Sequence, residues 1–427
     1  MKKVLIITYY WPPAGGPGVQ RWLKFVKYLG DFDVEPVVYV PENPSYPLID
    51  KSFEAEIPDG VRIIKKKIFE PYSIAGLFSK KETETISAGI ISKEENQSPL
   101  QKAMLFIRGN YFIPDARRFW VKPSVNTLKD ELEMGEYDTI VTTGPPHSLH
   151  LIGLRLKEEL DIKWIADFRD PWTQIGYHEK LKLTQKSRKK HEELEKKVLN
   201  SADHIITTSF TTKEEFSTKT LKPVTVITNG FDTEICENVP SGESFQMAHV
   251  GSLLSQRNPE NLWEAIGELI KENEQFADNF RLRLAGKVSE EVLKSIRNNG
   301  IQPYLENLGY VSHSKAVDLQ RSASVLLLIE IDSEETRGII PGKLFEYLAS
   351  RRPILAIGPE KWDVQQIIKE TGAGEVFGYK DKGSIKSHIL KLFENYKKDD
   401  LAFNSHGIGK YHRKRLTERL AALIKEV

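Results

Sequence analysis

The chain is poor in cysteine and nearly neutral in charge. Its 427 residues include one cysteine, Cys236, and 61 basic against 60 acidic side chains. A single cysteine forms no intrachain disulfide and no cysteine-based metal cluster. A net charge of +1 lacks the basic surplus that bulk attraction to nucleic acid requires, although it is compatible with a local basic patch. We therefore expect no nucleic acid partner.

Long apolar runs are also missing. No stretch approaches the roughly 18 apolar residues of a membrane span. The first apolar run, Val4–Ile7, is too short for the core of a signal peptide. Together with the single cysteine, these absences favour a cytoplasmic location.

What the sequence does contain is a regular alternation of short β-rich runs and amphipathic helical stretches. This pattern is typical of open parallel sheets that are covered on both faces. A chain of 427 residues is too long for one core, so two domains are expected. The expected strands are 4–8, 34–40, 139–143, 164–167, 204–208 and 225–228 in the first domain, and 247–250, 281–285, 324–328, 354–357 and 374–377 in the second.

The alternation lapses after Ile235 into a polar, turn-rich linker. We therefore predict an α/β fold with two doubly wound, Rossmann-like domains in series. The N-terminal domain spans 1–236, the C-terminal domain spans 246–405, and an amphipathic helix lies in 406–427. The interval 79–98 is polar and lacks periodicity, so we expect it to be a mobile insertion or loop.

The segment Pro341–Ser350 predicts a helix that opens at a Pro-Gly turn. Lys343 and Glu346 project from its first turn, where free backbone N–H groups favour an anion. A cation beside a phosphate and a carboxylate beside paired hydroxyls would together hold a nucleotide's diphosphate and ribose. A solvated ion pair on an ordinary helix is the competing interpretation.

Two glycine turns stand at equivalent places in the two domains. In the first domain, Gly15, Gly16 and Gly18 lie between the first strand and the first helix, where open α/β sheets bind ligands. Glycines there let backbone N–H groups approach a ligand closely, although a purely structural turn would have the same composition. In the second domain, Gly251 precedes Arg257, whose guanidinium either clamps a diphosphate or is an ordinary surface arginine.

These motifs resemble the GT-B glycosyltransferases, in particular the retaining enzymes of glycosyltransferase family 4, over almost the whole chain. Gly15–Gly18 resembles the loop of that family's N-terminal domain that serves donor and acceptor. Thr228–Asp232 stands where the family has a P-N-G-V-D motif. Gly251 with Arg257 resembles its G-R-L…K-G motif.

The resemblance implies a nucleotide-sugar site in the C-terminal domain. Arg257 and Lys343 would bind the diphosphate beside Gly251 and Gly342, and Glu346 would bind the ribose. Val311 lies in the loop that packs against the base in similar proteins. The resemblance further implies an interdomain cleft and a C-terminal helix that returns to the N-terminal domain. No D-x-D metal motif stands at a suitable position, so we expect no cofactor and a metal-independent reaction.

One position departs from the family pattern. The family often has two glutamates separated by seven residues, and the position eight before Glu346 is Gly338. Glu334 and Glu335 lie nearby but out of register. The first glutamate normally faces the sugar, so the donor sugar stays open. Backbone N–H groups of 338–342 are an alternative contact for a sugar hydroxyl.

Three candidate catalytic residues follow strands of the N-terminal domain, and we expect them to line the cleft. The resemblance implies a front-face route in which the leaving phosphate takes the acceptor's proton, so the protein supplies mainly electrostatic support. Asp167 is the first candidate for contact with the reacting sugar or acceptor hydroxyl, and Asp170 and His147 follow. A structural network of Asp167, Arg169 and Asp170 is the alternative, as is a capping or core role for His147.

The predicted function is transfer of a sugar, with retention, from a nucleotide sugar to a glycan or lipid-linked acceptor in surface-polysaccharide synthesis. A UDP-sugar 2-epimerase and a nucleotide-binding protein without turnover are the alternatives. Residues 106–113 and 117–122 mix aromatics with cations, and Lys65–Lys67 adds basic charge. This composition suits peripheral contact with a membrane at its inner face, but core aromatics with solvated charges would look the same.

Overall fold

The computed structural model describes residues 1–70, 99–174, 181–236, 243–399, 401 and 405–427. They form two α/β units. Unit 1 comprises Met1–Asn229 and Arg413–Val427, and unit 2 comprises Gly230–His412. The predicted domain boundaries at 236 and 406 lie a few residues from these divisions. The insertion expected at 79–98 lies outside the described residues.

Unit 1 is built on a seven-stranded parallel sheet with the order β3-β2-β1-β4-β5-β6-β7. Its strands are β1 Lys2–Ile7, β2 Val34–Pro41, β3 Arg62–Lys66, β4 Thr139–Gly144, β5 Lys163–Phe168, β6 His204–Thr207 and β7 Val224–Val226. Val4–Ile7 of β1 is buried throughout because helices cover both faces of the sheet. The edge strand β3 was not predicted. Its sequence, RIIKK, carries charges that are typical of protected sheet edges.

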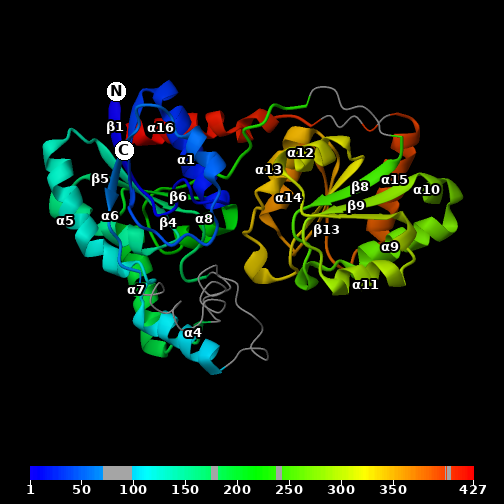
Figure 1. The fold of residues 1–427 in the computed structure, drawn as a ribbon, viewed down its shortest axis with the longest axis horizontal. Coiled ribbons are helices and arrows are strands. Elements are labelled where there is room, and N and C mark those ends of the chain that lie inside the picture. The colour runs from blue at the N-terminus through cyan, green and yellow to red at the C-terminus, as the bar shows by residue number, and fades with distance from the viewer. Residues whose placement is uncertain (71–98, 175–180, 237–242, 400, 402–404) are drawn as a thin grey trace. The chain divides into compact units, whose positions relative to one another are not determined.

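The helices of unit 1 include one from each end of the chain. They are α1 Pro17–Leu29, α4 Pro99–Tyr111, α5 Arg118–Met134, α6 Ser148–Leu160, α7 Gln185–Ser201, α8 Phe210–Ser217 and α16 Arg413–Glu426. The C-terminal helix α16 lies beside α1 (Figure 1) and buries Leu416, Leu420 and Ile424 at helical spacing. Arg413 donates to Gln20 of α1 at 3.0 Å. The last helix therefore completes the core of unit 1.

Unit 2 is built on a six-stranded parallel sheet with the order β10-β9-β8-β11-β12-β13. Its strands are β8 Phe245–Val250, β9 Phe280–Ala285, β10 Leu305–Gly309, β11 Val325–Ile329, β12 Ile354–Ile357 and β13 Gly374–Phe377. Its helices are α9 Glu260–Glu272, α10 Glu274–Asn279, α11 Glu290–Asn298, α12 His313–Ser322, α13 Lys343–Ser350, α14 Asp363–Thr371 and α15 Lys382–Lys397. Aromatic rings of Phe245, Phe276 and Phe393 pack together beneath the sheet.

Each sheet has one point where the strand order reverses. In unit 1 this point lies between β1 and β4, and in unit 2 it lies between β8 and β11. Loops leave the carboxyl ends of these neighbouring strands in opposite directions and open a crevice in which doubly wound proteins bind ligands. The predicted doubly wound α/β class is confirmed, and the two reversal points indicate where to look for sites.

Candidate functional site

Lys343 lies at the reversal point of unit 2, at the start of α13. Its Nζ lies 3.4 Å from Nε2 of His249, near the end of β8. A Cβ at Gly251 would lie 2.5 Å from this ammonium group, and Gly251 has a φ of +123°. Glycine is therefore favoured here for its backbone conformation, and a side chain would shift the ammonium group.

His249 is a buried neutral partner for that lysine. Its Nδ1 lies 2.9 Å from the carbonyl oxygen of Leu327. Because a carbonyl only accepts, Nδ1 carries the proton and Nε2 is left as an acceptor that faces Lys343. Burial holds the pKa of His249 well below its ordinary value, and the charge of Lys343 lowers it further. The imidazole therefore orients the ammonium group without adding charge.

Arg257 is held by a buried carboxylate that was not among the predicted site residues. Its Nε and Nη2 lie 2.9 Å and 2.7 Å from Oε1 of Glu330, which directly follows β11. Glu330 is 2% exposed and Arg257 is 29% exposed, so one edge of the guanidinium is fixed and the rest is open to solvent. An acidic residue directly after an apolar strand was the available signal for Glu330.

Arg257 is close enough to Lys343 for its charge to act on the ammonium group. Burial, and then the charge of Arg257, lower the pKa of Lys343 to about 8, even though Glu330 and Glu346 attract the ammonium group. A fold gains nothing from placing two cations side by side in a half-buried crevice. Such an arrangement is typical of a site that receives an anion.

Glu346 lies one helical turn beyond Lys343 and is also positioned by a neighbour. Its Oε2 accepts a hydrogen bond of 2.9 Å from Gln320 of α12. Tyr347, which is buried beside it, accepts one of 3.0 Å from the backbone N–H of Val250 and so fastens α13 to the end of β8. The predicted residues Arg257, Lys343, Glu346 and Gly251 therefore surround one reversal point.

The remaining predicted donor residues occupy flanking positions. Gly342 immediately precedes α13 at its capping position. Val311 follows β10, which is two strands from β8, in a loop where Gly309 has a φ of +62°. Glu334, near the unusual Gly338, forms an exposed ion pair with Arg337 at 3.0 Å.

Asp167, the first candidate catalytic residue, is fully buried in unit 1. It accepts hydrogen bonds from Arg21 at 2.8 Å and 3.3 Å, from Nε1 of Trp22 at 2.8 Å and from Thr143 at 2.9 Å. Burial alone would raise its pKa, but the charge of Arg21 and these hydrogen bonds lower it. The carboxylate is saturated by protein donors and fastens β5 to α1. Its predicted contact with substrate stays a prediction.

The other two candidates lie at different depths of the same sheet edge. His147 is 4% exposed and immediately precedes α6, and its ring stacks on Trp172 at 5.0 Å. It lines a small pocket of about 90 Å³ together with Tyr10 and Arg117. Asp170 is exposed. Among the described residues the alternative network of Asp167, Arg169 and Asp170 does not form, and Asp167 pairs with Arg21 of α1 instead.

The glycine turn of unit 1 lies at the same edge. Gly16 caps α1 with a φ of +96°, and the N–H of Gly15 donates to the carbonyl of Leu48 at 2.9 Å. Gly18 lies directly against the guanidinium of Arg169, which leaves no room for a Cβ. Arg169 was not among the predicted site residues, although it directly follows β5.

An exposed group of apolar side chains lies elsewhere on unit 1. We call Phe69, Phe106, Ile107, Tyr111 and Phe119 the aromatic face; each is at least 40% exposed. Phe119 contacts Phe69, and Arg118 donates to the carbonyl of Tyr111 at 2.9 Å. Trp120 and Val121, which were predicted to belong to this surface, are buried in the core instead. Among the described residues, no helix is long and apolar enough to cross a membrane.

Two protein-family models match most of the chain. Residues 90–235 match the family model Glycosyltransferase Family 4, and residues 244–395 match the model Glycosyl transferases group 1. Two parallel sheets of this kind define the GT-B architecture. The chain belongs to the GT-B glycosyltransferases and is similar to those of family 4. No curated protein matches its sequence.

Solved structures match over the full length at low identity. HepE from Anabaena, in complex with UDP, is 14% identical with a TM-score of 0.62, and the match covers 100% of both chains. Sucrose-phosphate synthase from Thermosynechococcus elongatus is 14% identical with a TM-score of 0.58, covering 100% of this chain and 98% of that one. A candidate UDP-N-acetylglucosamine 2-epimerase from Listeria monocytogenes is 13% identical with a TM-score of 0.57, covering 100% and 96%. These likenesses show the shared fold.

Proposed function

We propose that this glycosyltransferase moves a sugar, with retention of configuration, from a nucleoside-diphosphate sugar to a glycan or lipid-linked acceptor in cell-surface polysaccharide synthesis. The observation that carries the proposal is the pair of half-buried cations, Arg257 and Lys343, with the carboxylate of Glu346 one helical turn away. The spacing suits a diphosphate beside the cations and ribose hydroxyls beside the carboxylate.

The chemistry follows from where charge develops. As the bond between sugar and diphosphate breaks, negative charge gathers on the leaving phosphate. Arg257 and Lys343, already oriented by Glu330 and His249, stabilise that charge without reorganisation. In a front-face route the leaving phosphate takes the acceptor's proton. That route requires no protein base, which agrees with the saturated state of Asp167.

The relatives support the same substrate class. HepE has been solved with UDP and with UDP and glucose, and TarM with UDP and α-GlcNAc-glycerol. WaaG, at 12% identity and a TM-score of 0.56, is a glycosyltransferase of lipopolysaccharide biosynthesis. These ligands and roles belong to those proteins, and we extend to this chain only the class they share.

Thermal shift with nucleotides tests the donor site. UDP, GDP and ADP, each with a panel of their sugars, are added to wild type, to Arg257→Gln and to Glu346→Gln. We expect at least one nucleotide to raise the melting temperature of wild type and to act more weakly on both variants. If no nucleotide shifts wild type, or if the variants respond equally, the donor-site assignment fails. Conversion to an epimeric nucleotide sugar would favour the epimerase.

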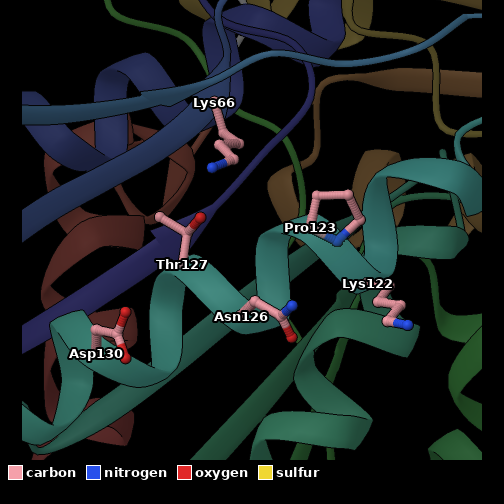
Figure 2. Close-up of a pocket in the computed structure, with 6 residues that line it drawn as sticks. All are labelled: Lys66, Lys122, Pro123, Asn126, Thr127 and Asp130. Atoms are coloured by element: carbon pink, nitrogen blue, oxygen red, sulfur yellow. The ribbon is translucent and has the colours of Figure 1, made fainter.

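We further propose that unit 1 makes peripheral contact with an anionic membrane through the aromatic face. Figure 2 shows the neighbouring pocket of about 510 Å³, in which Lys66 of β3 faces the α5 residues Lys122, Pro123, Asn126, Thr127 and Asp130. Among the described residues, neither Lys66 nor Lys122 forms an ion pair. Phe119 and Lys122 are three apart on α5 and share its exposed side. Apolar insertion and headgroup attraction would therefore act on the same surface.

Vesicle co-sedimentation tests this contact. Wild type is expected to bind vesicles that contain phosphatidylglycerol and to be released by salt. Phe69→Ser with Phe119→Ser, and separately Lys66→Gln with Lys122→Gln, should weaken binding. An exposed pair on α7, Lys189→Gln with Lys190→Gln, is the matched charge control. Equal binding by all variants would contradict the proposal.

A further inference from the structure

Arg169 is a cation at the reversal point of unit 1 that the donor site does not use. It is the first residue after β5. The backbone N–H of Arg169 donates to the carbonyl of Gly144 at 2.9 Å, and the hydroxyl of Thr208 donates to the carbonyl of Arg169 at 2.6 Å. The backbone is thus tied to the ends of β4 and β6, and the origin of the side chain is fixed.

The guanidinium extends from β5 across β4 toward the loop after β1. One terminal nitrogen donates to the carbonyl of Pro145, which follows β4. Cζ lies 5.6 Å from the centre of the Tyr10 ring, which follows β1, and the other terminal nitrogen lies against Gly18. The charge is therefore held between the loops that follow β1 and β4, where the sheet order reverses and ligands bind.

No carboxylate is paired with this charge. Among the described residues Arg169 forms no ion pair, and its Nε is buried without a hydrogen-bond partner. Asp167, the nearest buried carboxylate in sequence, is saturated by Arg21, Trp22 and Thr143 instead. Burial lowers the pKa of Arg169, although Asp170 attracts its charge. A half-buried guanidinium that forms no ion pair is costly, and an anionic ligand would lower that cost.

The space beside Arg169 has the size and charge for such a ligand. A pocket of about 90 Å³, close to the volume of roughly three water molecules, is lined by Tyr10 and Pro145. Arg169 is not among its lining residues, but it contacts both of these. Arg108, Arg117 and Asp115 line it, and Arg117 is paired with Glu70 at 3.1 Å. A group of the size of phosphate fits this volume.

We propose that Arg169 binds a phosphate group carried by the acceptor. The proposal rests on the glycosyltransferase function above and narrows its acceptor to a phosphorylated molecule, as in a lipid-linked diphosphate. A side chain at Gly18 would displace the guanidinium. Lysine would not replace Arg169, since a single ammonium cannot hold Pro145 and a phosphate in the same planar arrangement.

Calorimetric titration of the full-length chain with inorganic pyrophosphate tests the assignment. The titration is made in the presence of a saturating nucleoside diphosphate, chosen from UDP, GDP and ADP, so that the donor site is already filled. Wild type should bind pyrophosphate. Arg169→Gln and Gly18→Ala should bind it about ten- to a hundredfold more weakly, the range for loss of a charge-assisted hydrogen bond. Arg188→Gln, on the exposed side of α7, is the matched control and should bind as wild type does.

Each other outcome has a definite meaning. Equal pyrophosphate affinity for wild type and Arg169→Gln overturns the proposal, as does a lack of binding by wild type. A tenfold loss of nucleoside diphosphate affinity in Arg169→Gln also overturns it, because Arg169 would then bind the diphosphate of the donor and not a phosphate of the acceptor. If no nucleotide binds but pyrophosphate binding still depends on Arg169, the proposed function fails and the anion site stands.

Discussion

Arg257 and Lys343 of unit 2 lie side by side, so removing one of the two charges should stabilise the free protein and weaken its binding of a nucleoside diphosphate. Lys343 is half-buried, lies beside Arg257 and has a pKa lowered by burial to about 8. Lys343→Met keeps most of the side-chain volume and removes the charge. The unliganded protein should gain stability, because it no longer holds two cations together.

The sign and size follow from the protonation equilibrium. Between about pH 8 and 10.5 the unfolded chain binds a proton at Lys343 that the folded chain does not, so stability rises with pH through this window. Below about pH 8 the penalty is fully present. A fall of the pKa from 10.5 to about 8, at about 1.4 kcal/mol for each tenfold change, corresponds to about 3 kcal/mol. With some loss of packing, we expect Lys343→Met to gain about 1–3 kcal/mol at pH 7.

Urea denaturation at pH 7 and at pH 10.5, with nucleotide titrations in parallel, measures both effects. The gain should be present at pH 7 and largely absent at pH 10.5, and nucleoside diphosphate affinity should fall about ten- to a hundredfold. Lys294→Met, which removes an exposed lysine of α11, controls for the loss of one charge. A variant less stable than wild type at pH 7, or a gain that is equal at both pH values, would refute the reasoning.

Three further predictions follow from the same contacts. Nucleoside diphosphate affinity should fall roughly tenfold from pH 7 to pH 9, because the diphosphate requires the ammonium form of Lys343, whose pKa is about 8. In calorimetric titrations Lys343→Arg should remove this pH dependence. A wild-type affinity that is independent of pH would contradict the prediction. Asp167→Ala leaves the buried Arg21 without its carboxylate and should destabilise unit 1 by about 3–5 kcal/mol in urea denaturation; an unchanged unfolding curve would disprove the fastening role. Transfer should persist in excess EDTA, because the two cations stabilise the leaving diphosphate, and loss of turnover that Mg²⁺ restores would show that a metal is needed.

The sequence predicted the elements that have a clear apolar pattern. The helix α13 begins directly after the predicted Pro-Gly turn and ends at Ser350 as predicted, because Leu344, Tyr347 and Leu348 keep helical spacing and a buried strand follows. The edge strand β3 was missed, since its charged sequence RIIKK lacks that pattern. No helix was predicted over the segment of α5, which has Pro123 in its interior.

The site was predictable where one segment carries several of its groups. Lys343 and Glu346 lie on the same helical turn, and the glycine at 251 indicated a turn at which a ligand could come close to the backbone. Glu330 and His249 come from separate strands that only the sheet order brings together. Sequence alone also could not tell which of two guanidiniums reaches Asp167, and the structure places Arg21 there.

The central claim is that Arg257 and Lys343 support departure of a nucleoside diphosphate from a sugar. The most direct test is release of nucleoside diphosphate and free sugar from a panel of UDP-, GDP- and ADP-sugars, measured without acceptor. We predict slow release from at least one donor by wild type, and release at least about tenfold slower by Arg257→Gln with unchanged folding. Equal release by the two proteins, or release from none of the donors, would contradict the account.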